Sequence, residues 1–259
     1  MNFEDVKNLL DSKTELYNNH AFIENDPIQI PHKFVAREDI EISGFFAAIF
    51  SWGNRKTIIN KSNEFLKMMD NAPCDFIKNF SEIDLKPFLT FKHRTFNADD
   101  ALFFLNYFQE LYNTKGTLEQ KFTKGISIEN HYQMEQGLID FYNDIISKSY
   151  FMKRNGKHIS TPDKNSRCKR ILMFLRWMVR KDNNEVDFGI WNQISSSALF
   201  CPLDVHVEFA ARRLSLISRK QSDWKTVKEL TANLVKYDKT DPVKYDFALF
   251  NLSKEEKFR

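Results

Sequence analysis

A dense cluster of basic side chains lies between residues 151 and 182. This segment holds ten Lys and Arg residues and two Asp residues, a local charge of +8, whereas the whole chain of 259 residues has a formal charge of +3. Phosphate binding depends on local positive potential and on counterion release rather than on total charge. The cluster therefore predicts a site for a polyanion, and the alternative interpretation is a solvated basic loop.

The same segment contains a strongly amphipathic pattern over residues 168–180. Its apolar residues recur at i, i+3, i+4 and i+7, whereas Lys169, Arg176 and Arg180 fall on the opposite side of the expected helix. We predict a helix whose apolar stripe is buried and whose basic side faces outward. A solvated face is the usual explanation for such a basic side, so the pattern alone does not establish binding.

Asp204 precedes a second expected helix. Pro202 disfavours helix at the residue before it, and aspartate is a preferred N-cap residue, so we expect Asp204 at the helix N-terminus. An isolated aspartate in this position usually only caps, with a contribution of about 1 kcal/mol. His206, two residues further on, is by itself typical of a packed or surface imidazole.

The elements that must position these residues are expected to be helices. The chain has only 7 glycines in 259 residues, far fewer than turn-rich β architectures, dinucleotide folds and phosphate loops require. Helical spacing of apolar residues recurs near the N-terminus and in four further stretches. These stretches are 40–69, with a break near 51–54, then 98–113, 131–151 and 241–250. We therefore predict an all-α fold.

The spacing of cysteine and histidine and the length of the apolar runs argue against several classes of protein. The three cysteines, Cys74, Cys168 and Cys201, lack a C-x-x-C pair, which argues against a disulfide framework, a zinc ribbon and a four-cysteine iron–sulfur cluster. The six histidines are scattered, so we expect neither a metal nor a cofactor. No signal pattern and no apolar run of about 18 residues is found, which predicts a cytoplasmic protein without membrane contact.

Four segments carry a resemblance to known proteins. Residues 42–48, 168–180, 202–206 and 241–250 together resemble an uncharacterised bacterial family of unknown function across nearly the whole chain. A lysine that opens an amphipathic helix, followed by Leu-Asp-Val-His-Val and an arginine-rich helix, is similar to the core of the helix-hairpin-helix DNA glycosylase superfamily. That superfamily includes endonuclease III, and the separation of Lys169 from Asp204 is most similar to the archaeal 8-oxoguanine glycosylases.

The resemblance implies a fold and a reaction. The fold would be a single compact helical unit (1–259) with two lobes, 41–165 and 1–40 plus 166–259, and a cleft between them. The reaction would be removal of a damaged base from DNA, in which Lys169 attacks C1′ to form a Schiff base and Asp204 stabilises positive charge on the sugar. Both roles come from the superfamily, and neither follows from composition or spacing.

The resemblance also implies contacts to duplex DNA. The expected contacts to the DNA backbone are Lys164, Ser166, Arg167, Arg170, Arg176, Arg180, Asn54 and Arg55. The candidates for stacking on an extruded base are Trp52, Trp177 and Trp191. Tyr245 or Asp246 could also point into the cleft.

The chain departs from the superfamily pattern in three places. The usual hairpin is rich in glycine, whereas this chain has Asp-Lys-Asn-Ser-Arg-Cys before Lys169, so phosphate contact would have to come from side chains. The C-terminal iron–sulfur cysteines of endonuclease III are missing, and residues 181–200 form an insertion between the two site elements. Two alternatives therefore stay open: a nucleic-acid-binding helical module without catalysis, and a helical scaffold whose basic face meets an acidic protein partner.

Overall fold

The computed structural model describes residues 1–254, and these form an all-helical chain. In this range no β-strand occurs, and only two isolated bridges, His93 with Phe96 and Ile128 with Ile194, have β pairing. The α-helices are α1 (Phe3–Tyr17), α2 (His20–Glu24), α3 (Arg37–Phe50), α4 (Arg55–Lys67), α5 (Pro73–Asn79), α6 (Ala98–Asn113), α7 (Leu118–Thr123), α8 (His131–Ile146), α9 (Lys169–Val179), α10 (Val205–Arg213), α11 (Trp224–Val235) and α12 (Tyr245–Lys254). The prediction of an all-α fold is confirmed.

Seven short 3-10 helices connect these elements within the described range. They are η1 (Pro27–Gln29), η2 (Pro31–Lys33), η3 (Lys86–Thr90), η4 (Asn155–Lys157), η5 (Pro162–Lys164), η6 (Ser196–Ala198) and η7 (Pro242–Lys244). Five of the seven have proline in their first turn. Proline has no backbone N–H, and none is needed there, because the first N–H groups of a helix have no acceptor within it. Proline is therefore accommodated at the start of these short helical turns.

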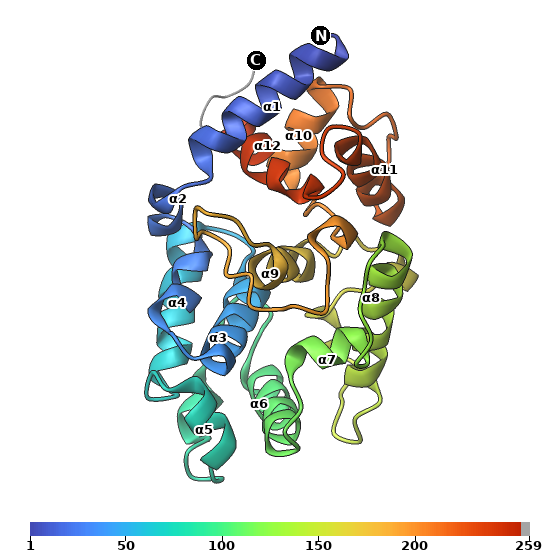
Figure 1. Cartoon of the computed structure of the whole chain (residues 1–259). Coiled ribbons are helices and arrows are strands. Elements are labelled where there is room, and N and C mark those ends of the chain that lie inside the picture. The colour runs from blue at the N-terminus through green and yellow to red at the C-terminus, as the bar shows by residue number, and fades with distance from the viewer. Residues whose placement is uncertain (255–259) are drawn as a thin grey trace.

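Two groups of helices are evident in Figure 1. The helices α1, α10, α11 and α12 gather at one end of the molecule, and α1 and α10 both pack on α12. The helices α3 to α8 form the other end, and α9 lies between the two groups and packs against α3. The first and last helices of the described range, α1 and α12, are therefore neighbours. The boundaries of the expected lobes stay a prediction.

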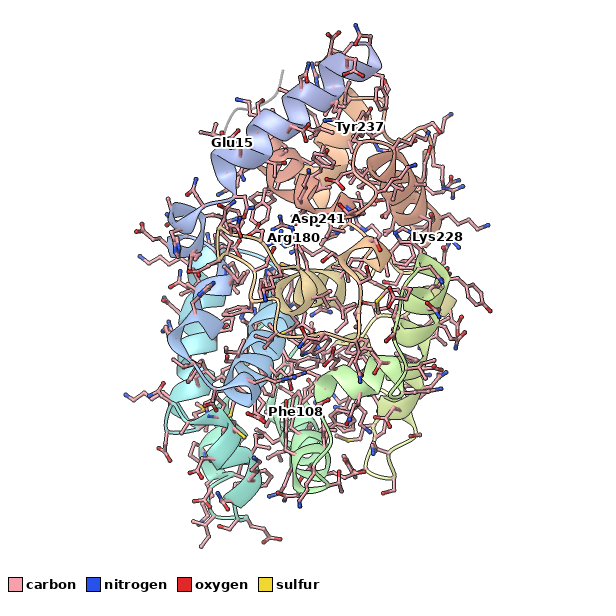
Figure 2. The ribbon with its side chains drawn as sticks, in the orientation of Figure 1. Glu15, Phe108, Arg180, Lys228, Tyr237 and Asp241 are labelled. Atoms are coloured by element: carbon pink, nitrogen blue, oxygen red, sulfur yellow. The ribbon has the colours of Figure 1, made fainter. Side chains whose placement is uncertain are left out.

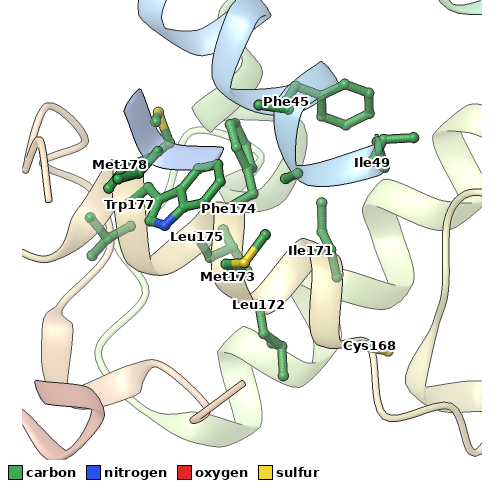
Figure 3. Close-up of a cluster of buried hydrophobic side chains, with 14 of the residues drawn as sticks. Phe45, Ile49, Cys168, Ile171, Leu172, Met173, Phe174, Leu175, Trp177 and Met178 are labelled. Carbon is green, nitrogen blue, oxygen red and sulfur yellow. The ribbon is translucent and has the colours of Figure 1, made fainter. Parts of the chain in front are cut away.

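The central helix α9 is buried on nearly every side. Every residue from Ile171 to Val179 is buried, and Figure 3 shows the apolar side chains of α9 against Phe45 and Ile49 of α3. The rings of Phe45 and Phe174 meet edge to face with centroids 5.8 Å apart. Burial of one such side chain contributes about 1.5–3 kcal/mol. The apolar stripe predicted from the sequence therefore anchors α9 in the core.

Some elements differ from the sequence-based expectation. Four helices, α2, α5, α7 and α11, lie in stretches where no helix was predicted, and three of them, α2, α5 and α7, span only 5, 7 and 6 residues, too few to show a helical repeat. The break near residues 51–54 is confirmed, since α3 ends at Phe50 and α4 begins at Arg55. Gly53 lies in that turn with a φ of 110°, a conformation that favours glycine.

None of the helices in the described range combines the length and the apolar character that are needed to cross a membrane.

Candidate functional site

A pocket of about 640 Å³ is lined by residues from both groups of helices. Its wall is built from five parts of the chain: residues 22–27, the turn between α3 and α4 with the start of α4, one side of α9, the N-terminus of α10 and one face of α12. Lys169 and Asp204 both line this pocket. Two residues that are 35 positions apart in the sequence are therefore brought to one cavity.

Lys169 is the first residue of α9, and an unusual turn presents it. The turn contains η5 and two residues in the left-handed region, Asn165 with a φ of 53° and Cys168 with a φ of 52°. Asparagine tolerates this region better than most residues, whereas a cysteine there is uncommon. The turn therefore forms without glycine. Lys169 is half-buried, at the start of a helix without a side-chain cap.

Asp204 caps α10, as its sequence position predicts. Its Oδ1 accepts hydrogen bonds from the backbone N–H groups of His206 and Val207, both at 2.9 Å. The cap uses one oxygen only, so Oδ2 is not needed for it. A capping role and a place in the pocket are therefore compatible, and the positive end of α10 favours an anion at this position.

The basic side of α9 does not face outward, contrary to the sequence-based expectation. Arg176 is 3% exposed, with Nε 3.2 Å from Oδ1 of Asp187 and Nη1 bonded to Oδ2 of Asp246. Its guanidinium also lies over the ring of Phe247, 4.3 Å from the centroid. Arg176 touches the pocket wall, but its donors are engaged by carboxylates. A phosphate contact by Arg176 stays a prediction, and it would compete with these carboxylates for the guanidinium.

Arg180 is also buried, and it does not line the pocket. It is 2% exposed and pairs with Asp182 at 2.7 Å, Asp187 at 3.1 Å and Asp241 at 2.9 Å. Figure 2 shows Arg180 beside Asp241, between the two groups of helices. The prediction of DNA contact by Arg180 is wrong, because the insertion and the segment before α12 cover this side of α9.

Two of the three tryptophan candidates are enclosed in the core. Trp177 is fully buried, and Trp191 is 2% exposed with its Nε1 donating to Oε1 of Glu41 at 2.8 Å. Neither ring can stack on an extruded base, so these two predictions are wrong. Trp52 differs, since it is 36% exposed and lines the pocket. The guanidinium of Arg94 lies 4.5 Å from its ring centroid.

The remaining candidates divide between the pocket and the surface. Arg167, Arg170, Asn54 and Arg55 line the pocket, whereas Lys164 and Ser166 do not. Lys164 is exposed and lies over the ring of Tyr142, 4.5 Å from its centroid.

Each of the four pocket residues has a protein partner. Arg167 lies 3.3 Å from Glu208, and Arg55 lies 3.5 Å from Asp26. Asn54 caps α4 by accepting from the N–H of Thr57 at 3.2 Å.

Arg170 has no carboxylate within 4 Å among the described residues. Its Nη1 donates to the carbonyl of Ile49 at 2.7 Å, and Nη2 donates to the carbonyl of Lys157 at 3.3 Å. Burial lowers the pKa of the Arg170 guanidinium to about 10. A guanidinium that is largely buried without a counter-ion favours an anionic ligand. Arg170 is therefore the pocket cation best placed to receive a phosphate.

Two acidic pocket residues, Asp26 and Asp246, were not among the catalytic or DNA-binding candidates. Asp26 lies before η1 and accepts from the N–H of Ile28 at 3.1 Å. Asp246, one of two residues that the sequence offered near the cleft, lines the pocket, whereas the hydroxyl of Tyr245 donates to Asp11 at 2.8 Å, away from it. Helical spacing could have favoured Asp246, because it shares a face with the pocket residue Phe250 four positions later.

The described residues contain no group of three or more His, Cys, Asp or Glu side chains arranged to hold a metal ion. Cys168 and Cys201 are buried free thiols, and burial raises the pKa of both, to about 12 for Cys168. These thiols therefore favour a packing role over a reactive one.

Comparison with known families gives one match. The profile of a family described as "Protein of unknown function (DUF2400)" matches residues 26–255, which is most of the chain. No curated protein matches the chain. No solved structure matches it either.

Proposed function

Because the chain belongs to this family of unknown function, the pocket is the best guide to its activity, and we propose that the protein is a DNA glycosylase with lyase activity. The observation that carries the proposal is that Lys169 and Asp204 line one pocket. The sequence resemblance supplies a nucleophile and a carboxylate in those two positions, and both must address the same sugar.

The proposed reaction uses each residue for one task. The Lys169 amine attacks C1′ of the damaged nucleotide while the bond from C1′ to the base breaks, and the base leaves with the electron pair. The Asp204 carboxylate stabilises the positive charge that develops on the sugar. The sugar ring then opens to a Schiff base on Nζ, and this intermediate permits strand cleavage by loss of the 3′ phosphate.

The pocket also has the size and lining that an extruded nucleotide needs. Its volume of about 640 Å³ falls in the range typical of small-molecule sites. Trp52 offers an aromatic face at the wall, and Arg170 offers a cation for a phosphate. Base-flipping enzymes combine these features, because the extruded base must stack and its flanking phosphates must be held.

Borohydride trapping tests the proposal. The protein is incubated with duplexes that hold an abasic site, 8-oxoguanine, uracil or hypoxanthine, and sodium borohydride is added to reduce a Schiff base to a stable adduct. We expect a covalent protein–DNA band with the wild type and none with Lys169→Gln. Lys164→Gln is the matched control, because Lys164 is exposed and lies outside the pocket, and this variant should trap like the wild type.

Two outcomes would contradict the proposal. DNA binding by the wild type without a trapped adduct on any duplex would favour a binding module that has lost catalysis. Trapping that persists in Lys169→Gln would assign the nucleophile to another amine.

A further inference from the structure

Asp246 is a buried carboxyl group in the wall of the pocket. It is the second residue of α12 and is 7% exposed, yet it belongs to the pocket lining together with Lys169 and Asp204. Its Oδ2 accepts a hydrogen bond from Nη1 of Arg176. This bond fixes the carboxyl group on one side and leaves Oδ1 for the pocket.

Arg176 holds Asp246 rigidly. The guanidinium is bonded to Asp187 of the insertion at 3.2 Å as well as to Asp246, and it lies over the ring of Phe247. Both partners are buried. A buried group with a locked orientation is suited to proton transfer, because the reaction then needs little reorganisation of its surroundings.

The charges around Asp246 come from three parts of the chain. Arg176 and Lys169 of α9 favour its carboxylate form, whereas Asp204 at the start of α10 disfavours it. The buried thiol of Cys201, between the insertion and α10, is also within electrostatic range. Burial is the largest influence, and together with Asp204 it raises the pKa of Asp246 to about 6. A substantial fraction of Asp246 is therefore protonated just below neutral pH.

Asp204 and Asp246 thus lie in different environments of the pocket. Asp204 is at the positive end of α10 and accepts two backbone N–H bonds, an arrangement that favours an anion. Asp246 is enclosed by apolar packing and one guanidinium. Two carboxyl groups in one site with contrasting surroundings are the usual basis for one acid and one charged stabiliser.

We propose that Asp246 is the general acid that protonates the departing base. The inference rests on the proposed function and adds a third group to it. The Oδ–H proton of Asp246 moves to a ring nitrogen of the base as the bond from C1′ to the base breaks, and the bonding electron pair leaves with the base. The Lys169 amine bonds to C1′ in the same step, and the proton that Nζ loses on forming this bond passes to the Asp246 carboxylate.

The test separates departure of the base from attack on the sugar. A duplex with an abasic site needs no leaving-group acid, because its base is already missing, so borohydride trapping on this duplex reports Lys169 alone. Release of a base from a damaged duplex requires both groups. The wild type is first tested on duplexes with 8-oxoguanine, uracil or hypoxanthine. The duplex from which it releases a base is then used to measure the single-turnover rate of base release.

We expect Asp246→Asn to slow base release by about 10² or more while trapping on the abasic duplex changes less than about threefold. Asp241→Asn is the matched control, since Asp241 belongs to the same ion-pair network through Arg180 but does not line the pocket. It should leave both rates near those of the wild type. Retained trapping also demonstrates that Asp246→Asn is folded.

The pH profile of the wild type provides a second measurement that does not depend on folding of the variant. Base release should slow as the pH rises above about 6, because the acid is then lost, whereas trapping on the abasic duplex should not slow over the same range.

The possible failures are distinguishable. Base release that is equally fast in Asp246→Asn, or that does not slow above pH 6, would overturn the acid role and leave the proposed function intact. A wild type that neither releases a base nor forms an adduct would overturn both.

Discussion

The carboxylate of Asp204 has two oxygen atoms, and the cap of α10 uses only Oδ1. A purely structural role and a catalytic role therefore predict different responses to substitution. Asparagine caps helices about as well as aspartate, since its side-chain oxygen accepts the same bonds. It lacks the negative charge that would stabilise the reacting sugar.

We expect Asp204→Asn to change the free energy of unfolding by less than about 0.5 kcal/mol and to slow base release by about 10² or more. Chemical denaturation and single-turnover kinetics measure the two effects. Asp204→Ala removes both the cap and the charge. It should therefore slow base release and also lower the free energy of unfolding by about 1 kcal/mol. An unchanged rate of base release in Asp204→Asn would show that Asp204 only caps α10.

At the scale of elements, α9 shows how a basic helix face can become an interior surface. The insertion contributes Asp187, and the C-terminal segment contributes Asp241 and Asp246, so that Arg176 and Arg180 are neutralised by residues distant in sequence. Breaking a buried ion pair by removing one partner costs about 3–5 kcal/mol, because a charge is left buried and uncompensated.

We therefore expect Asp187→Ala to lower the free energy of unfolding by about 3–5 kcal/mol, since Asp187 pairs with both arginines. Urea denaturation followed by circular dichroism measures this change. Asp163→Ala is the control, because Asp163 is exposed in the turn before α9 and its loss should alter stability by less than about 0.5 kcal/mol. An equally small effect of Asp187→Ala would show that the ion pairs add little to stability.

At the scale of the whole molecule, three histidines connect stability to pH. Burial lowers the pKa of His93, His131 and His158 in the folded chain. The unfolded chain has histidine pKa values near 6.5, so below that pH it binds more protons than the folded chain does. The buried neutral histidines therefore make their full contribution to the free energy of unfolding above about pH 6.5. This contribution is lost progressively as the pH falls toward the pKa values of the folded chain.

His131→Gln tests this dependence at a half-buried position, where Nε2 of the imidazole lies 3.2 Å from the carbonyl oxygen of Leu199. We expect the free energy of unfolding to fall less between pH 7.5 and pH 5.5 in the variant than in the wild type, because one histidine no longer takes up a proton on unfolding. Parallel denaturation curves at the two pH values provide the comparison. The same fall in both proteins would show that His131 does not contribute.

The sequence by itself determined the features that depend on neighbours along the chain. The scarcity of glycine and the helical spacing of apolar residues predicted an all-α protein, and the residues around Pro202 predicted the cap at Asp204. Such features follow from local propensities and backbone hydrogen bonds, which act over a few residues. The local pattern also placed Lys169 at the start of a helix with a buried apolar stripe.

Only the tertiary structure decided which side chains face the pocket. The sequence treated Arg176, Arg180, Trp177 and Trp191 as available, whereas helix packing buries all four. Helical periodicity fixes which residues share a face, but it does not state what covers that face. Here the insertion and α12 cover the basic side of α9, because burial of apolar rings such as Phe247 brings their aspartates to the arginines. The same packing placed Asp246 beside Lys169 and Asp204.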